Sequence, residues 1–214
     1  MPFSKKVDPM SADQGKKPGG SGGGQPPRDP NTFTQEVHYS QVSARVPEKV
    51  ARGAFSTGVL VLQGPHEFVL DFVLRMTQPQ LVSARVILPI TMMPNVINAV
   101  DENLRGYTSR FGPPPALPVP TPPPTPPSLD EIYEQLKLTD EQLSGNYANA
   151  MMITHTPAEF CLDFISTIYP RSAVSARVYM AAAQIPGLLN TLQRAYQQFQ
   201  QKIAGQQPKP GTGN

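Results

Sequence analysis

The sequence has few of the residues that would point directly to a chemical function. It contains one cysteine, three histidines and no tryptophan among 214 residues, and no apolar run long enough to span a membrane. A single cysteine excludes a disulfide within the chain, so nothing indicates an oxidising compartment. Eighteen basic and sixteen acidic residues give a net charge of +2, which neither directs the protein to nucleic acid nor excludes it. We therefore expect a cytoplasmic protein that does not associate with membranes.

The usual signatures of enzyme active sites are also missing. No G-x-S-x-G, phosphate-loop or dinucleotide fingerprint occurs. Glu67 and Asp71 are separated by about 13 Å on an expected strand, which is too far for a glycosidase pair. The histidines lack neighbouring metal ligands, and Cys161 falls within an expected strand, where a half-buried hydrophobe is more typical than a nucleophile. We predict no catalytic residue, no cofactor and no metal, and hence a protein that is not an enzyme.

The sequence contains two copies of one folding unit. Residues 53–107 align without gaps on residues 145–199, at a constant offset of 92 and with 14 identities in 55 positions. An internal repeat of this kind determines the architecture before any local pattern is considered. The identical residues of the first copy are Gly53, Pro65, Glu67, Phe68, Leu70, Asp71, Phe72, Val82, Ser83, Ala84, Arg85, Val86, Pro94 and Asn98.

Proline and glycine divide the chain into five segments. Residues 1–37 and 205–214 have too little apolar content to offset the entropy of ordering, so we expect disordered tails. The repeats occupy residues 38–112 and 128–204, and the proline-rich residues 113–127 join them. We expect this linker to be an extended polyproline II spacer. A ligand for an aromatic groove on another protein is the alternative, although no basic residues flank its P-x-x-P spacings.

Each repeat is predicted to fold as β-β-β-α. In the first copy, residues 57–63, 67–76 and 82–88 are rich in β-branched residues or alternate between apolar and polar, which is typical of strands. From Met93 onwards the apolar residues recur at helical spacing, and Pro94 falls in the first turn, where proline is tolerated. The second copy repeats this pattern at the same offset.

Short helices are expected ahead of the strands. The capping-box spacing of Ser128 and Glu131 predicts a helix over residues 129–137. One further turn of helix is expected directly before Gly53 and before Gly145.

The expected sheets carry apolar residues on both faces, although one helix can cover only one of them. A unit of about 60 residues is also small to be stable alone. We therefore predict an α+β fold in which two β-β-β-α repeats pack on each other as a pseudo-twofold dimer, with an antiparallel sheet and two helices. The second face consists of Val69, Val73 and Ile87 in the first copy and of Cys161, Ile165 and Tyr179 in the other.

Two repeated acid–base pairs are the candidate site residues. Asp71 lies opposite Arg85, and Asp163 opposite Arg177, if the second and third strands of each copy pair. We interpret the pairs as cross-strand ion pairs that set the register of the sheet. The alternative is that they are presented to a ligand or partner.

A third VSARV stands before the first copy, at residues 42–46. Three interpretations are open: a remnant of the third strand, an added edge strand that could pair with a neighbouring molecule, or coincidence.

The order of these motifs resembles that of a known family. The second copy reads GNYANAMMITHTPAEFCLDF and then VSARVYM, and the first reads GAFSTGVLVLQGPHEFVLDF, VSARVILP and ENLRGYTSRFG. This pattern is similar to the bacterial and archaeal domain of unknown function family 3467, in tandem duplication. The resemblance implies a small repeated bacterial module and supplies no mechanism.

The function expected from these observations is binding without catalysis. We expect a protein-protein interaction or scaffolding module that associates with itself, as a pseudo-dimer or homo-oligomer, and with an unknown protein. The alternative is a single-stranded nucleic-acid-binding protein that stacks bases on its sheet. The phenylalanines of the strands alternate as core residues do and no basic stripe accompanies them, which disfavours nucleic acid.

Overall fold

The computed structural model describes most of both repeats. The described residues are 44–118, 125, 127–168 and 170–206. Three predicted segments lie wholly or partly outside them. These are the tail at residues 1–37, residues 207–214 of the tail predicted at 205–214, and residues 119–124 and 126 of the linker.

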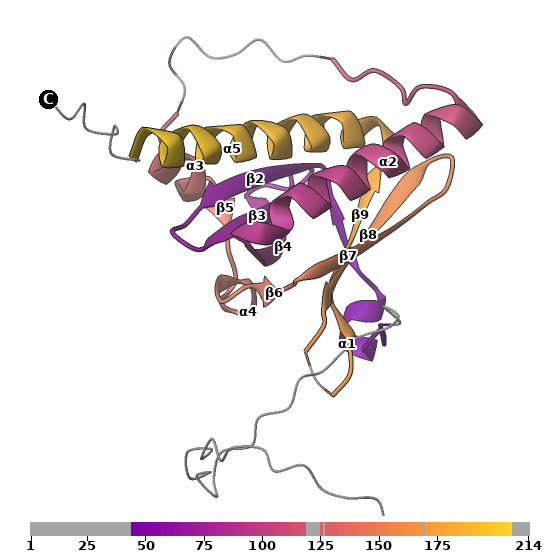
Figure 1. Ribbon diagram of the computed structural model, residues 1–214, viewed down its shortest axis with the longest axis horizontal. Helices are drawn as coiled ribbons and strands as arrows, with labels where there is room; N and C mark the ends of the chain where they lie inside the picture. The colour runs from indigo at the N-terminus through magenta and orange to yellow at the C-terminus, as the bar shows by residue number, and fades with distance from the viewer. Residues whose placement is uncertain (1–43, 119–124, 126, 169, 207–214) are drawn as a thin grey trace, which may run out of the picture. The chain divides into compact units, whose positions relative to one another are not determined.

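Each copy contains the three strands and the long helix that its sequence pattern predicts (Figure 1). A short helix and one further strand precede them, and the sequence pattern did not reveal that strand. The first copy consists of α1 (Glu48–Ala51), β1 (Ala54–Ser56), β2 (Gly58–Gln63), β3 (Glu67–Leu74), β4 (Gln80–Pro89), η1 (Ile90–Met92) and α2 (Met93–Phe111). The second consists of α4 (Asp140–Leu143), β6 (Asn146–Tyr147), β7 (Ala150–His155), β8 (Glu159–Ser166), β9 (Ala173–Ala181), η2 (Ala182–Gln184) and α5 (Ile185–Gln206).

The two copies exchange their first strands. β1 of the first copy pairs with β9 of the second, and β6 of the second pairs with β4 of the first. Both of these pairings are parallel, whereas β2, β3 and β4, like β7, β8 and β9, pair antiparallel. The predicted antiparallel sheet is therefore corrected to two mixed sheets, each completed by a strand from the other copy.

The long helices also cross between the copies. α2 packs against β7 of the second copy, α5 packs against β2 of the first, and the two helices contact each other. They lie together on one side of the sheets (Figure 1). Aromatic contacts follow the same exchange, with ring centroids 5.6 Å apart for Phe68 and Phe199 and 5.4 Å apart for Tyr107 and Phe160. Each helix thus buries apolar side chains of the other copy's sheet.

The core lies between the helices and the phenylalanine faces of the two sheets. Phe72 and Phe164 occupy equivalent positions of the repeats, and their ring centroids are 5.5 Å apart. The two copies therefore meet through these faces, and the prediction that the second face joins them is wrong. On that second face Val73 and Ile165 are buried, but Val69 is only half-buried.

The segment that precedes α4, at the start of the second repeat, covers part of the first sheet. The predicted capping box is present, with the Glu131 amide donating to Ser128 Oγ over 3.2 Å and the Ser128 amide donating to the Glu131 carboxylate over 2.7 Å. Helix α3 (Leu129–Glu134) ends earlier than predicted, because β5 (Leu136–Lys137) follows and pairs with β4.

The described part of the third VSARV occupies the corresponding place on the other sheet. Arg45 forms a parallel bridge with Ala173. These two residues are each related by the 92-residue offset to a pair in β5 and β4, Lys137 and Leu81. Of the three interpretations, the added edge element agrees with the structure, while Val42 and Ser43 lie outside the described residues.

Glycine is required where each first strand enters the other sheet. Gly53 and Gly145 have φ values of +65° and +68°, a region that disfavours residues with a Cβ. A Cβ at Gly53 would lie 2.5 Å from Tyr179 Cε2, and one at Gly145 would lie 2.9 Å from Arg85 Cγ. Backbone conformation and close approach to the other copy therefore both select glycine.

Replacing Gly53 by alanine tests this requirement. We expect the free energy of unfolding, measured by urea denaturation, to fall by about 2 kcal/mol because overpacking adds to the cost of the positive φ. Gly106 is the matched control, since it lies within α2 with open space around its Cβ position. Gly106→Ala should raise the free energy by about 0.5–1 kcal/mol. Equal effects of the two substitutions would contradict the account.

Candidate functional site

The first candidate pair forms a two-point ion pair across β3 and β4. Arg85 Nε donates to Asp71 Oδ1 and Arg85 Nη2 to Asp71 Oδ2, both over 2.7 Å. Asp71 is fully buried, and the Arg85 side chain is 14% exposed. The hydrogen bond to Asp71 raises the pKa of Arg85 above its ordinary value. The register of the strands, in which the two residues face each other, produces this geometry.

The second pair repeats this arrangement across β8 and β9. Arg177 Nε donates to Asp163 Oδ1 over 2.7 Å, and Arg177 Nη2 donates to Asp163 Oδ2 over 2.8 Å. The hydrogen bond to Asp163 likewise raises the pKa of Arg177. The structure thus brings together all four candidate residues that were predicted from the sequence, as two separate pairs.

Each arginine also makes a contact that the sequence did not predict. Arg85 Nη1 donates to the carbonyl of Leu143 over 3.1 Å, and Arg177 Nη1 donates to the carbonyl of Ala51 over 3.4 Å. Leu143 and Ala51 end the short helices α4 and α1, whose last carbonyls have no partner within the helix. Each ion pair therefore ties its own sheet to the short helix of the other copy.

The surroundings of the two aspartates differ. The Tyr133 hydroxyl of α3 donates to Asp71 Oδ2. Burial, followed by the neighbouring Asp71, raises the pKa of Tyr133. At the second pair, Cys161 Sγ lies 3.7 Å from Asp163 Oδ1, and burial together with the Asp163 charge raises the pKa of the thiol. A thiol held in its protonated form is a poor nucleophile.

A groove lies on the outer face of the second sheet. It has a volume of about 670 Å³ and is formed by residues of both copies, because Phe55 belongs to β1 whereas Cys161 and Tyr179 belong to β8 and β9. Phe55 is 42% exposed. Tyr147, at the equivalent position of β6, is also 42% exposed but does not line this groove.

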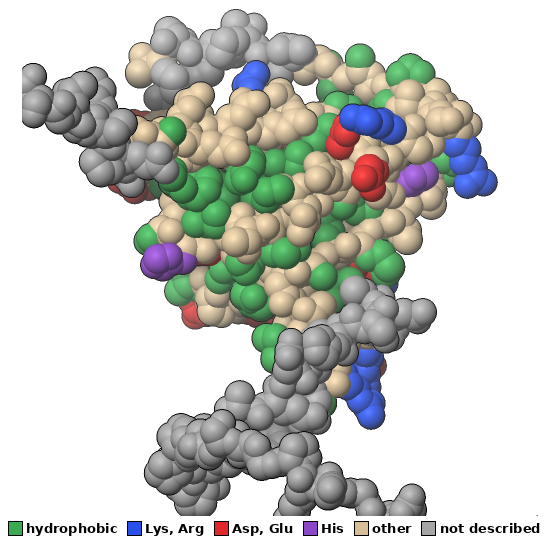
Figure 2. Space-filling view, viewed as in Figure 1, with side chains coloured by type: hydrophobic (Ala, Val, Ile, Leu, Met, Phe, Trp, Pro, Cys, Tyr) green, Lys and Arg blue, Asp and Glu red, His purple; other side chains and the backbone are tan. Residues whose placement is uncertain are grey.

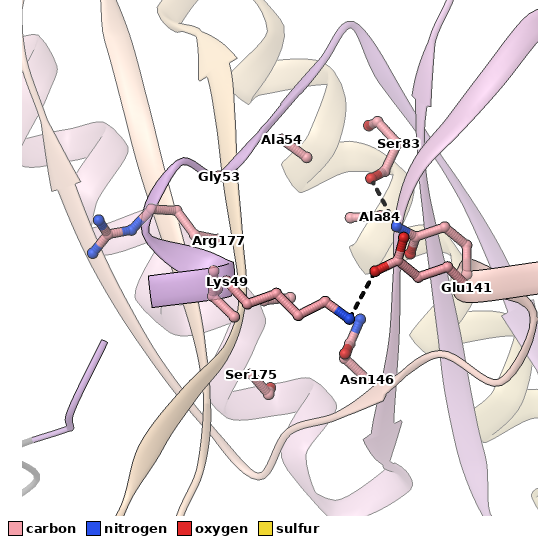
Figure 3. A pocket seen from close by; sticks show the side chains of 12 residues that line it. Lys49, Gly53, Ala54, Ser83, Ala84, Glu141, Asn146, Ser175 and Arg177 are labelled. Atoms are coloured by element: carbon pink, nitrogen blue, oxygen red, sulfur yellow. Dashed lines mark hydrogen bonds and ion pairs between the residues drawn. The ribbon is translucent and has the colours of Figure 1, made fainter. Parts of the chain in front are cut away.

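A second, more polar cavity of about 250 Å³ lies between α1 and α4 (Figure 3). Most of its lining consists of residue pairs related by the 92-residue offset, so it lies on the pseudo-twofold axis between the copies. We call it the axial cavity. The pairs are Lys49 and Glu141, Val50 and Gln142, Ala54 and Asn146, Ser83 and Ser175, and Ala84 and Ala176.

One ion pair crosses the axis at this cavity. Lys49 Nζ lies 2.7 Å from Glu141 Oε1, although both side chains are largely exposed. The hydrogen bond from Lys49 lowers the pKa of Glu141. Sequence reasoning missed both residues and Phe55. The signal available was the aligned repeat itself, in which position 49 and its equivalent at 141 carry opposite charges.

Other types of site leave no trace among the residues that the structure describes. In the described ranges, no three or more His, Cys, Asp or Glu side chains gather as metal ligands would. No helix in this part of the chain is both long and apolar enough to cross a bilayer.

The profile of one protein family matches residues 12–114 and, separately, residues 120–204. The chain belongs to this family, described as protein of unknown function (DUF3467). The two matches assign one DUF3467 domain to each copy, so the repeat is a tandem duplication of that domain. No curated protein and no solved structure matches the chain.

Removing a charge from a buried pair should destabilise this tandem DUF3467 chain. For Asp71→Asn we expect a fall of about 3 kcal/mol in the free energy of unfolding, because Arg85 keeps a buried charge without its counterion. The pair of Asp101 and Arg105 on α2 is the control, because the Arg105 side chain is 78% exposed and Asp101 is only half-buried, and Asp101→Asn should change the free energy by less than about 0.5 kcal/mol. Unchanged stability in Asp71→Asn would reject a structural role for the pair.

Proposed function

We propose that the protein is a non-enzymatic binding module that takes an extended, apolar segment of a partner protein into the groove beside Phe55. The observation that carries this proposal is the exposure of the Phe55 ring. A large aromatic side chain next to half-buried apolar neighbours is the type of anchor on which protein interfaces concentrate binding energy.

The width of the groove supports an extended segment as the occupant. Phe55 lies on β1 and Thr154 lies on β7, and these strands form the two opposite edges of the order β1-β9-β8-β7. Adjacent strands lie about 4.8 Å apart, so the groove runs across the sheet for about 14 Å. An extended segment of about four residues spans this distance, with one side chain against Phe55.

The charges around the groove favour a polypeptide. Arg52 and Glu159 both line it, so its charged residues carry opposite signs. A nucleic-acid strand would meet a carboxylate as well as a guanidinium, without the basic track that follows a phosphate backbone. On the face drawn in Figure 2, Lys and Arg side chains also stand apart from one another.

Single-strand nucleic-acid binding is the second candidate, because exposed aromatic rings on strands can stack bases. Phe55 and Tyr147 have this position, unlike the buried phenylalanines of β3 and β8. A gel shift with an oligothymidylate at low salt separates the candidates. A shift that weakens with salt and is lost in Phe55→Ser would favour nucleic acid over the peptide proposal.

Selection from a displayed library of short random peptides tests the proposal. We expect the wild-type protein to enrich apolar sequences, and the synthetic peptides to bind Phe55→Ser at least about tenfold more weakly, since a buried aromatic anchor contributes more than about 1.4 kcal/mol. Tyr147→Ser is the matched control, because Tyr147 is equally exposed but lies outside the groove.

The thermal unfolding of each variant must match that of the wild type, so that lost binding is not lost folding. Equal affinity of the selected peptides for the wild-type protein and Phe55→Ser, or no enrichment at all, would overturn the proposal.

A further inference from the structure

The groove beside Phe55 carries one charge of each sign in its lining. Arg52 lies two residues before the start of β1, Glu159 is the first residue of β8, and both side chains are exposed. Neither forms an ion pair with any residue that the structure describes. Glu159 Oε2 accepts a hydrogen bond from Thr156 Oγ1 over 2.8 Å, but this hydroxyl carries no charge. The groove therefore keeps a guanidinium and a carboxylate that a bound molecule can reach.

The two charges lie at opposite ends of the groove. Ala54 of β1 pairs with Val178 of β9. Glu159 of β8 pairs with Ala181, three residues further along β9. Because β9 separates β1 from β8, Ala54 and Glu159 lie about 10 Å apart across the sheet and about 10 Å apart along it, or about 14 Å in all. Arg52 precedes Ala54, on the side away from Glu159.

Two aromatic rings and a thiol lie between the charges. Phe55, Tyr179 and Cys161 line the groove in one row of the sheet, because Phe55 pairs with Tyr179 and Tyr179 pairs with Cys161. An apolar side chain of a bound segment can be buried against this row. An extended segment covers about 3.3–3.6 Å per residue, so side chains four to six positions apart reach both ends of the groove. A bound segment thus meets a cation, an apolar row and an anion in turn.

The first sheet lacks one of these charges at the equivalent positions. Glu159 corresponds to Glu67, but Arg52 corresponds to Ser144. The basic end therefore distinguishes the surroundings of Phe55 from those of Tyr147, the equivalent exposed ring on the first sheet. Divergence of the copies has given charges of both signs to the groove on the second sheet.

We propose that the groove selects extended segments that carry an acidic residue on one side of the apolar anchor and a basic residue on the other, four to six positions apart. The acidic side chain pairs with Arg52 and the basic one with Glu159. This inference rests on the proposed function, because it names the type of segment that the same groove binds. Exposed ion pairs add little affinity, but a like charge at either end is repelled, so the two charges determine specificity.

Peptides with three charge patterns test the proposal. Three displayed libraries share a randomised centre of four apolar residues, which is flanked by one aspartate and one lysine, by two aspartates or by two lysines. The centre enriched from the pooled libraries is then synthesised with each pair of flanking residues and with blocked termini, and the affinities are measured by calorimetry. We expect the mixed peptide to bind the wild-type protein at least about threefold more tightly than either of the others.

Reversing one charge of the groove should change this preference. In Arg52→Glu both ends of the groove are acidic, so the peptide with two lysines should bind most tightly. In Glu159→Lys both ends are basic, so the peptide with two aspartates should bind most tightly. Arg194→Glu is the matched control and should keep the wild-type preference, because Arg194 is exposed on α5 and lies outside the groove.

The outcomes separate this inference from the proposed function. Equal affinities of the three peptides for the wild-type protein, all weakened by Phe55→Ser, would overturn the charge pattern and leave the groove as the binding site. A wild-type preference for two like charges, or a preference that Arg52→Glu leaves unchanged in a variant with wild-type thermal unfolding, would also overturn it. No enrichment from any library, or binding that Phe55→Ser leaves unchanged, would overturn the proposed function and this inference together.

Discussion

The structure depends on the exchange of first strands between the two copies. β1 and β6 each complete the other copy's sheet, and this exchange requires the backbone to pass within van der Waals distance of the side chains on β9 and β4. Glycine at positions 53 and 145 permits the approach. The arginines over which the glycines pass then bind the short helices that precede them. The exchanged strand, the glycine before it and the ion pair beneath it thus form one linkage between the copies. This linkage occurs twice, at Gly53 and at Gly145.

Both candidate sites are consequences of this linkage. The groove beside Phe55 forms because β1 of the first copy places an aromatic ring on the sheet of the second copy. The axial cavity forms between the two short helices α1 and α4. Duplication within one chain also allows equivalent positions to diverge, which a homodimer cannot do. Lys49 therefore meets an acidic residue, Glu141, across the axis.

The elements with strong periodicity could be predicted from the sequence. Alternation predicted the strands over residues 67–76 and 82–88, which correspond to β3 and β4. Helical spacing predicted α2 and α5, and the expected strand register predicted the ion pairs. The exchange could not be predicted, because β1 has three residues and β6 has two, too few for any period. The second apolar face was wrongly predicted to join the two copies for a related reason. The segment that contains α3 and β5 lies beside Val73 of that face, and no local sequence pattern indicates a contact between segments so far apart in the chain.

The most direct test of this account is the assembly state of one copy alone, measured by sedimentation equilibrium with circular dichroism on the peptide spanning residues 38–112. Without the second copy, β4 lacks its partner β6 and β2 lacks the cover of α5. We predict that this peptide folds only as a dimer that restores the exchange, and that dilution dissociates and unfolds it together. A monomer that is folded and unfolds cooperatively would contradict the account.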